Sequence, residues 1–166
     1  MKKLLKVAII TVSDKGYHGE REDRSGKYII QYFKEKGWEI ADYEIIPDEK
    51  DMISKKLKDI SDNEKANLIL TTGGTGFSPR DVTPEATEEV IEKRAPGFDE
   101  IIRIEGRKKT PRAILSRGVS GIRKKTLIIN LPGSIRGVKD SLELIYFPLP
   151  HGIDILTGRD MECGQE

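Results

Sequence analysis

A glycine-rich turn and the charged segment after it are the residues best suited to chemistry in this chain. An apolar run, residues 68–72, leads directly into Gly73-Gly74-Thr75-Gly76, and Arg80-Asp81 follows shortly afterwards. Three glycines in four positions permit positive φ and close approach of backbone N–H groups to a ligand, and neighbouring threonine hydroxyls add further donors. The turn can therefore wrap a phosphate, with the Asp81 carboxylate close to it in sequence.

Simpler interpretations exist for each of these residues. A glycine-rich connection is often only a tight corner after a strand, and this one matches neither a P-loop nor a complete dinucleotide fingerprint. Asp48 could cap the helix that follows it. Asp81 could interact favourably with the positive N-terminal end of a helix dipole, or it could pair with Arg80. Residue types alone therefore leave structural and catalytic roles open.

Length and charge limit the class of protein. The chain of 166 residues fits a single domain, residues 1–166, with its core at about 5–157 and a polar C-terminal tail. Lys and Arg number 29 against 28 Asp and Glu, so the electrostatic signature of a nucleic-acid-binding protein is missing. No targeting segment or membrane span is expected.

The numbers and positions of cysteine and histidine argue against an internal disulfide bond and a zinc site. The single cysteine, Cys163, can form no internal disulfide, which is typical of a reducing compartment and predicts a cytoplasmic protein. Neither His18 nor His151 has a cysteine or histidine at metal-ligand spacing, so a zinc site and a histidine-centred triad are not expected.

Strand-like and helix-like segments alternate along the chain, which predicts an α/β fold with a mostly parallel sheet covered by helices on both faces. The expected strands are residues 5–12, 38–46, 67–72 and 126–131, and the expected helices are residues 25–36, a segment after Asp48, a segment from 83 and one ending near 146. Thr83 is the expected N-cap of the third helix, with Pro84 in its first turn.

Apolar periodicity identifies the buried faces of the first two helices. The inward positions are expected to be Ile29, Ile30 and Phe33, then Met52, Ile53, Leu57 and Ile60. The stretch around 96–111 is interpreted as irregular. Two basic clusters, residues 107–109 and 123–125, are interpreted as exposed loops.

Several special residues follow the expected strands at equivalent places. Ser13-Asp14, Pro47-Asp48, Thr72-Gly73 and Pro132-Gly133 each come after a strand. Ligands of open parallel sheets bind along this edge, where helix N-termini favour anions. Two carboxylates there, Asp48 and Asp81, would suit Mg²⁺ held against a nucleoside triphosphate.

A set of motifs, in order, resembles the MogA/MoaB-type molybdenum cofactor proteins, including the gephyrin G domain. These motifs are residues 11–14, 23–26, 47–49, 71–76, 80–87, 96–98, 113–117 and 129–134. The resemblance covers about residues 5–157. It implies a three-layer α/β sandwich of the molybdopterin-binding fold, usually a homotrimer, which in the MogA branch transfers AMP from Mg²⁺-ATP to molybdopterin and releases pyrophosphate.

The resemblance also implies roles for individual residues. Asp48 and Asp81 become the catalytic and Mg²⁺-binding pair, and the tract 116–120 with Asn130 would help to hold the pterin phosphate. The residues assigned to binding of nucleotide or pterin are Ser13, Asp14, Ser25, Gly26, Thr72, Gly73, Gly74, Thr75, Gly76, Thr83, Pro84, Glu85, Ser116, Arg117, Ser120, Asn130, Pro132, Gly133 and Ser134. Ile135 stands where the family often has proline.

Alternatives stay open at this point. A MoaB-like protein could bind molybdopterin without catalysis or act as a scaffold with other cofactor-biosynthesis proteins, but it need not keep both Asp48 and Asp81. A nucleotide-cleaving hydrolase of the CinA type shares the fold but is usually longer. The two aspartates therefore favour the adenylyltransferase.

Overall fold

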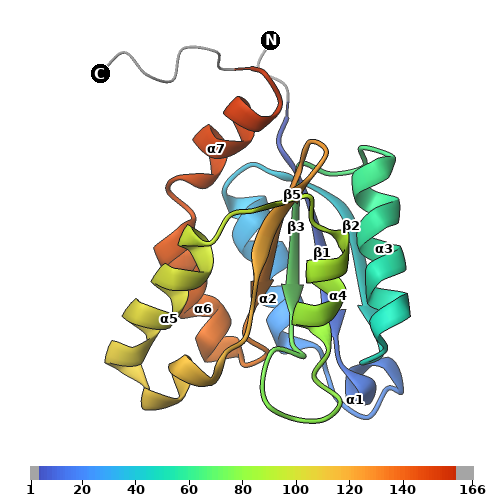
Figure 1. The fold of residues 1–166 in the computed structure, drawn as a ribbon, viewed down its shortest axis with the longest axis vertical. Helices are drawn as coiled ribbons and strands as arrows, with labels where there is room; N and C mark the ends of the chain where they lie inside the picture. Colours follow the sequence, from blue (N-terminus) through green and yellow to red (C-terminus); the bar gives the residue numbers. More distant parts are fainter. Residues whose placement is uncertain (1–3, 160–166) are drawn as a thin grey trace.

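The sheet is the central layer of the fold. The computed structural model describes residues 4–159, and within them the strand order is β2-β1-β3-β6-β5-β4. Strands β1 (Lys6–Val12), β2 (Glu39–Ile46), β3 (Leu68–Thr72) and β6 (Thr126–Leu131) are parallel (Figure 1). At one edge, β5 (Ser120–Arg123) pairs antiparallel with β6, and β4 (Lys93–Arg94) pairs antiparallel with β5. The mostly parallel α/β sheet is confirmed.

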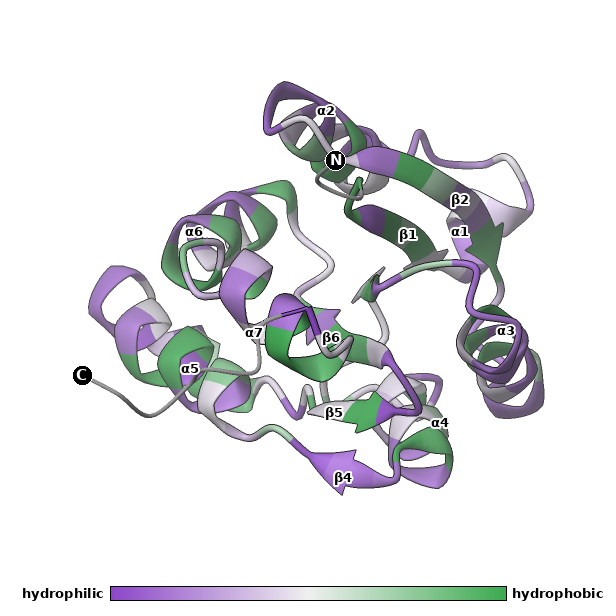
Figure 2. Ribbon diagram, turned by 90° about the horizontal axis from the view of Figure 1, so that it is seen from above, coloured by the Kyte–Doolittle hydropathy of each residue, from purple (hydrophilic) through white to green (hydrophobic). Residues whose placement is uncertain are grey.

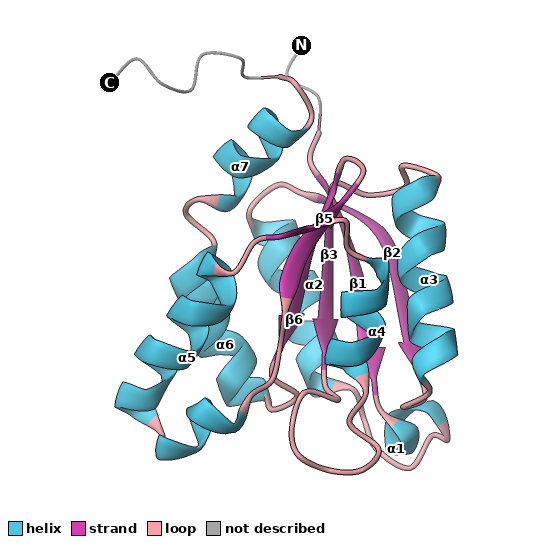
Figure 3. Ribbon diagram, viewed as in Figure 1, coloured by secondary structure: helices cyan, strands magenta, loops and turns pink. Residues whose placement is uncertain are grey.

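Helices cover both faces of this sheet (Figures 2 and 3). The helices are α1 (Asp14–Tyr17), α2 (Arg24–Glu35), α3 (Lys50–Asp62), α4 (Thr83–Val90), α5 (Gly97–Lys109), α6 (Ile135–Ile145) and α7 (Leu149–Leu156), and a 3₁₀ helix, η1, spans Pro111–Leu115. Helices α2, α5, α6 and α7 pack on one face, and α3 and α4 pack on the other. The three-layer sandwich is as predicted.

Strand β1 shows why both faces must be covered. Val7 and Ile9 belong to the apolar cluster on the α2 and α6 side, whereas Ala8, Ile10 and Val12 belong to the cluster on the α3 and α4 side. Alternate side chains of a strand point to opposite faces, so a nearly continuous apolar run is buried twice. Strands β1, β3 and β6 are thereby fixed between two cores, with β2 at the edge beside β1. The carboxyl ends of these four parallel strands meet at one edge of the sheet.

Helix α5 corrects the prediction of an irregular stretch around 96–111. Pro96 and Gly97 suggested a loop, but Pro96 is the N-cap and the helix continues to Lys109 with Ile102 buried. The cluster 107–109 does not lie in a loop but in the last turn of this helix, where positive charges interact favourably with the helix dipole. Arg123 likewise lies in β5, and the short pairing of β4 with β5 was not predicted.

Two smaller predictions about helices were wrong. Met52 was expected inside but is 42% exposed, while Ile53, Leu57 and Ile60 are buried as predicted. Thr83 is the first residue of α4, not its N-cap, which is Val82. The buried Thr83 hydroxyl instead donates to the carbonyl of Gly73, so it supports the glycine turn.

Arg123 joins the antiparallel edge to the rest of the fold, which gives a testable contribution to stability. Its guanidinium donates to both Asp62 carboxylate oxygens, at 2.8 and 3.0 Å, and to the carbonyl of Val90 at 3.0 Å. The hydrogen bond from Arg123 lowers the pKa of Asp62.

We expect Arg123→Gln to lower the melting temperature by about 2 °C at neutral pH. Because the pKa of Asp62 is lowered in the folded state, its stabilisation is present above the unfolded pKa and is lost as pH falls through the folded one. The difference between wild type and variant should therefore shrink below about pH 4. Thermal melts of both proteins at a series of pH values measure this, and a difference that grows on acidification would contradict it.

No helix in the described range 4–159 has the length and apolar character needed to cross a membrane.

Candidate active site

The carboxyl ends of β1, β2, β3 and β6 place their following loops at one edge of the sheet, the lower edge in Figure 1. The chain passes from β1 to β2 on one side and from β3 to β6 on the other, so the connections diverge between β1 and β3. Such a switch point is where open α/β sheets bind ligands. The loops after Val12 and Thr72 flank it.

Only glycine fits the turn that follows β3. Gly73 has φ +100°, and a Cβ there would lie 2.3 Å from the carbonyl oxygen of Val12. Gly74 has φ +68°, and its Cβ would lie 2.3 Å from Thr83 Oγ1. The same turn packs against the loop after β6, where a Cβ on Gly133 would lie 3.2 Å from the Gly73 Cα. Bare backbone therefore lines this part of the edge.

Two hollows adjoin the glycine turn. The apolar hollow, about 470 Å³, lies between the loop after β3 and the wall formed by α5, η1 and α6. Its apolar lining includes Phe77, Ile102, Ala113, Leu115 and Leu144. The polar hollow, about 650 Å³, lies on the β1 side and is lined by residues that include Ser13, Asp23, Ser25 and Asp48.

Both hollows share four lining residues, Gly74, Asp81, Gly133 and Ser134. The two spaces therefore meet at the loops after β3 and β6. The larger hollow offers charged and hydroxyl groups, and the smaller one an apolar surface. This arrangement suits two ligands, or two parts of one ligand, whose reacting groups meet at the glycine turn.

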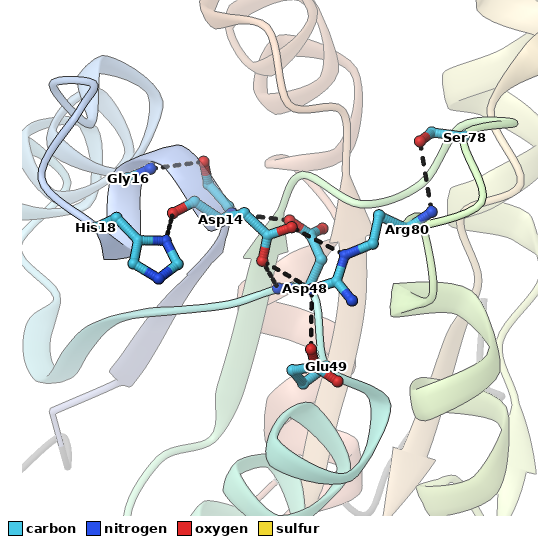
Figure 4. A network of polar contacts seen from close by, with 8 residues as sticks. Asp14, Gly16, His18, Asp48, Glu49, Ser78 and Arg80 are labelled. Atoms are coloured by element: carbon cyan, nitrogen blue, oxygen red, sulfur yellow. Dashed lines mark hydrogen bonds and ion pairs between the residues drawn. The ribbon is translucent and has the colours of Figure 1, made fainter.

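Asp14 and Asp48 hold each other through reciprocal hydrogen bonds (Figure 4). The Asp14 N–H donates to Asp48 Oδ2 at 2.8 Å, and the Asp48 N–H donates to Asp14 Oδ1 at 3.0 Å. Asp48 is thus not a cap of α3, whose N-cap is Glu49. Its carboxylate instead fixes the backbone at the start of α1.

The electrostatics of the two carboxylates differ. Burial raises the pKa of Asp48, and the negative charges of Asp14 and Asp81 add to this rise. Hydrogen bonds from Arg80 are the main cause that lowers the pKa of Asp14. Asp14 is therefore a well-stabilised anion, whereas Asp48 lies where additional positive charge would stabilise it.

Arg80 binds Asp14 and Glu49, not Asp81. Its Nε and Nη2 donate to the two Asp14 oxygens at 3.0 Å each, and Nη2 also donates to Glu49 Oε1 at 2.9 Å (Figure 4). Asp81 Oδ2 accepts from the Ser78 N–H at 3.1 Å. An ion pair between neighbours Arg80 and Asp81, one of the simpler interpretations of the sequence, is therefore not formed.

Most of the predicted binding residues lie around this edge, several as hydrogen-bond partners of the loops. Ser25 Oγ donates to the Gly133 carbonyl at 2.8 Å, and Thr72 Oγ1 donates to the Pro132 carbonyl at 2.7 Å. The predicted residues that line at least one hollow are Ser13, Ser25, Asp48, Thr72, Gly73, Gly74, Thr75, Gly76, Asp81, Ser116, Pro132, Gly133 and Ser134.

Serine hydroxyls cap two of the helices that start at this edge. Ser13 Oγ accepts from the Gly16 N–H in α1, and Ser134 Oγ accepts from the Gly137 N–H in α6, both at 3.0 Å. Ile135, the departure from the family pattern, is the first residue of α6 and lines the polar hollow.

Other predicted residues support the site from outside the hollows. Arg117 donates to the carbonyls of Gly76 at 2.7 Å and Asp81 at 2.9 Å, and it pairs with Glu85. Gly26 lies where a Cβ would come within 2.1 Å of Asp23 Oδ2. Asp14, Thr83 and Pro84 border the loops without lining either hollow.

Ser120 and Asn130 are not brought to the hollows. Ser120 is buried and donates to Asp99 through both its backbone N–H and its hydroxyl. The buried Asn130 amide donates to Thr71 at 2.9 Å and Thr87 at 3.0 Å. Both side chains connect elements of the fold, so their predicted contact with a pterin phosphate is not supported by their position.

The polar hollow contains a group that sequence reasoning did not select. Asp23, the N-cap of α2, accepts from Thr11 Oγ1 at 2.7 Å, from the Gly26 N–H at 2.9 Å and from the Tyr43 hydroxyl. Burial, followed by the contact with Asp23, raises the pKa of Tyr43. The sequence offered one indication of this role, because an Asp directly before a helical pattern is typical of an N-cap.

The wall of α5, η1 and α6 was also missed as part of the site. Leu115 and Leu144 line the apolar hollow, and the charged residues Arg112 and Asp140 line it as well. Nothing in the sequence separates these residues from ordinary surface or core positions. Their role depends on the packing of α5 against α6.

The donor set fits Mg²⁺ bound together with a phosphorylated ligand. Within residues 4–159, no three His, Cys, Asp or Glu side chains group as a metal site. Asp48 and Asp81 nevertheless flank the glycine turn, since a Cβ on Gly74 would lie 3.1 Å from Asp48 Oδ1 and one on Gly76 2.9 Å from Asp81 Oδ2. Mg²⁺ commonly takes one or two carboxylates, waters and substrate phosphates.

Comparisons with known proteins agree on one family. A family profile described as "Probable molybdopterin binding domain" matches residues 8–151. The "Molybdopterin adenylyltransferase" of Helicobacter pylori (strain ATCC 700392 / 26695) is 41% identical over 162 residues, covering 96% of this chain and 92% of that protein. The protein of the same name from Escherichia coli (strain K12) is 34% identical over 176 residues, covering 98% and 90% respectively.

A solved structure is similar over nearly the whole chain. The "Molybdopterin biosynthesis enzyme MoaB" from Thermus thermophilus superposes with a TM-score of 0.88 at 49% identity, covering 93% of this chain and 98% of that one.

Proposed function

The chain belongs to the family of probable molybdopterin binding domains, and from this membership we propose that it is a molybdopterin adenylyltransferase of molybdenum cofactor biosynthesis. It transfers AMP from ATP to the terminal phosphate of molybdopterin. An oxygen of that phosphate attacks the α-phosphorus of ATP, the bond from the α-phosphorus to the bridging oxygen breaks, and pyrophosphate leaves.

The observation that carries this proposal is the meeting of two hollows at Gly74, Asp81, Gly133 and Ser134. The reaction brings together two large molecules, each with a heterocyclic ring system and a phosphate end. One hollow for each reactant, with the phosphates at the shared glycine turn, brings the attacking oxygen and the α-phosphorus together. Positioning two reactants in this way supplies a large part of the rate enhancement of a group-transfer reaction.

Both reactants are anions, so the site must offset their repulsion. The turn presents backbone in place of side chains, because a Cβ at Gly73 or Gly74 would collide with Val12 or Thr83. Backbone N–H groups can then approach the phosphate oxygens directly. When bound by Asp48 and Asp81, Mg²⁺ would supply positive charge to the α-phosphate and the departing pyrophosphate.

Asp48 is suited to this role by its surroundings. Its Oδ2 accepts the Asp14 N–H, and Oδ1 lies on the side of Gly74 and accepts no hydrogen bond from the described part of the chain. Burial raises the pKa of Asp48, which a nearby cation would reverse. One oxygen is thus fixed and the other is available to a ligand.

A direct assay tests the proposal. The purified protein is incubated with molybdopterin, Mg²⁺ and ATP labelled at the α-phosphate, and the products are separated. We expect label on the pterin and one pyrophosphate for each adenylated pterin formed. Binding of molybdopterin without any transfer of label would contradict it.

A second candidate function is molybdopterin binding without AMP transfer, the role considered for MoaB-like proteins. The observation in its favour is the 49% identity to the Thermus structure, which carries the name MoaB. Retention of Asp48 and Asp81 at the two sides of the glycine turn favours the enzyme, because binding of the pterin alone does not require a pair of metal-binding carboxylates. The labelling assay separates the two.

We also propose that the protein is a homotrimer in the cytoplasm, which delivers its product to other cofactor-biosynthesis proteins. Phe147 is 92% exposed and directly precedes Pro148. Pro148 lines an apolar groove together with Ala95, Pro96, Phe98, Ile101 and Leu144. Burial of such a surface against a second copy would be favourable. The single cysteine in the sequence supports the choice of compartment.

Sedimentation at micromolar concentration should therefore give a mass close to three chains of 18.7 kDa. We expect Phe147→Glu to shift the protein towards monomer, because a buried unpaired carboxylate is costly. Met52→Glu, which changes an exposed residue of α3, is the matched control and should stay trimeric. A wild-type protein that sediments as a monomer would refute the trimer.

A further inference from the structure

Arg80 cross-links three loops that are distant in the sequence. Asp14 follows β1, Glu49 follows β2, and Arg80 lies in the loop between β3 and α4. The three hydrogen bonds, two to Asp14 at 3.0 Å and one to Glu49 at 2.9 Å, span 66 and 31 residues of chain. Figure 4 shows the guanidinium between the two carboxylates. The loops on the β1 and β2 side of the site are therefore tied to the loop after β3.

The loop that Arg80 holds contains Asp81. On its other side this loop is held by Arg117, which donates to the carbonyls of Gly76 and Asp81. Within the loop, the Ser78 N–H donates to Asp81 Oδ2. Arg117 fixes the loop to the β5 side of the fold, whereas Arg80 ties it to Asp14 and Glu49 through its side chain. The distance from Asp81 to the β1 and β2 loops therefore depends on Arg80.

Asp48 is reached by the same connection. Arg80 engages both oxygens of Asp14, and Asp14 Oδ1 also accepts the Asp48 N–H while its own N–H donates to Asp48 Oδ2. A chain of contacts thus runs from Arg80 through Asp14 to Asp48. Since Asp81 is the next residue after Arg80, one side chain relates the positions of both carboxylates.

Charge adds a second reason for an arginine at this place. Four carboxylates, those of Asp14, Asp48, Glu49 and Asp81, lie at this edge of the sheet. An unpaired set of this kind would repel a triphosphate. The guanidinium offsets Asp14 and Glu49 through a fork that matches a carboxylate in two bonds, which a lysine ammonium cannot reproduce.

We propose that Arg80 is a positioning residue that sets Asp81 relative to Asp48 for binding of Mg²⁺-nucleotide, acting through Asp14 and Glu49 and not by contact with substrate. Its effect on turnover rests on the proposed AMP transfer. Its effect on the loop and on Mg²⁺-nucleotide binding does not. The two can therefore be tested separately.

The first test uses the protein without ligand. Hydrogen exchange of the backbone amides is compared between wild type and Arg80→Gln. We expect exchange over residues 73–82 to rise by about tenfold or more, because the tie to Asp14 and Glu49 is removed. Arg94→Gln is the matched control, since Arg94 is an exposed arginine paired with Glu88 at the far edge of the sheet. It should leave exchange in this loop unchanged.

The second test measures binding. Calorimetric titration uses an ATP analogue with a methylene group between the α- and β-phosphorus, with and without Mg²⁺, and molybdopterin alone. We expect Arg80→Gln to weaken binding of the Mg²⁺ complex by about tenfold and to leave the other two affinities within about twofold of wild type. Equal weakening with and without Mg²⁺ would mean direct contact with phosphate and would overturn the proposal.

Variants of the partner residues test the route of the effect. Asp14→Ala should weaken Mg²⁺-nucleotide binding at least as much as Arg80→Gln, and the double variant should lose less than about threefold more. Arg80→Lys should recover only part of the affinity. Additive losses in the double variant, or wild-type behaviour of Arg80→Gln in both tests, would overturn the positioning role. Absence of AMP transfer in the wild type would instead refute the proposed function alone.

Discussion

Asp48→Asn should cut AMP transfer by about 10²-fold, roughly 3 kcal/mol of barrier, with little change in melting temperature. The asparagine side-chain oxygen can still accept the Asp14 N–H, as Asp48 Oδ2 does at 2.8 Å, so the loop contact is kept. What is lost is the negative charge that a Mg²⁺ ligand needs. Turnover of labelled ATP and a thermal melt of the same sample give both quantities.

The control for this prediction is Asp51→Asn. Asp51 lies in the first turn of α3, three residues further along the chain, and is exposed. It tests whether loss of any nearby carboxylate reduces activity. We expect turnover within about twofold of wild type. If Asp48→Asn keeps near wild-type turnover, the Asp48 carboxylate serves only the backbone of Asp14 and the metal role is wrong.

Gly73→Ala should destabilise the protein by about 3 kcal/mol and remove binding of both phosphorylated ligands. The added Cβ would lie 2.3 Å from the carbonyl oxygen of Val12, which is backbone of the buried strand β1 and cannot turn away. The positive φ of +100° adds strain for any residue other than glycine. Denaturant unfolding measures the stability, and calorimetry measures the binding.

Gly19→Ala separates strain from collision. Gly19 also has a positive φ, +75°, but a Cβ there meets no atom within 4 Å among the described residues. Its replacement should therefore cost only about 1 kcal/mol. If the loss of stability at Gly73 is no greater than at Gly19, the turn after β3 can move away from Val12 easily. The close packing of this turn would then not be important for function.

Much of the fold could be predicted because the signals are local. Residues 7–12 are apolar with one threonine, which indicates a strand buried on both faces, and β1 alternates between the two cores as expected. Helix α5 could not be predicted in this way, since its N-terminus carries proline and glycine and only Ile102 and Asp99 are buried. Its apolar side chains pack into the core cluster shared with α6, which is a tertiary contact.

In the candidate site, too, features set by chain order could be predicted, whereas those set by tertiary contacts could not. The loops after strands could be placed at one edge from chain order alone, and the structure brings the loops that carry Ser13, Asp48, Gly74 and Gly133 together there. The binding of Arg80 to Asp14 could not be derived, because partners 66 residues apart are chosen by the fold. The buried positions of Ser120 and Asn130 were hidden for the same reason, since a polar residue in a motif does not reveal which way it points.

The backbone contact between Gly73 and Gly133 has a consequence for redesign. The glycine turn, which is the proposed phosphate end of the site, presents main chain, whereas the apolar hollow is bounded by side chains of η1 and α6 such as Leu115 and Leu144. The two parts are therefore separable targets. Under the proposed function, substitutions in the apolar hollow are expected to alter which ring system binds there while the glycine turn stays unchanged. A library confined to those side chains is therefore the most direct route to a changed preference for one of the two substrates.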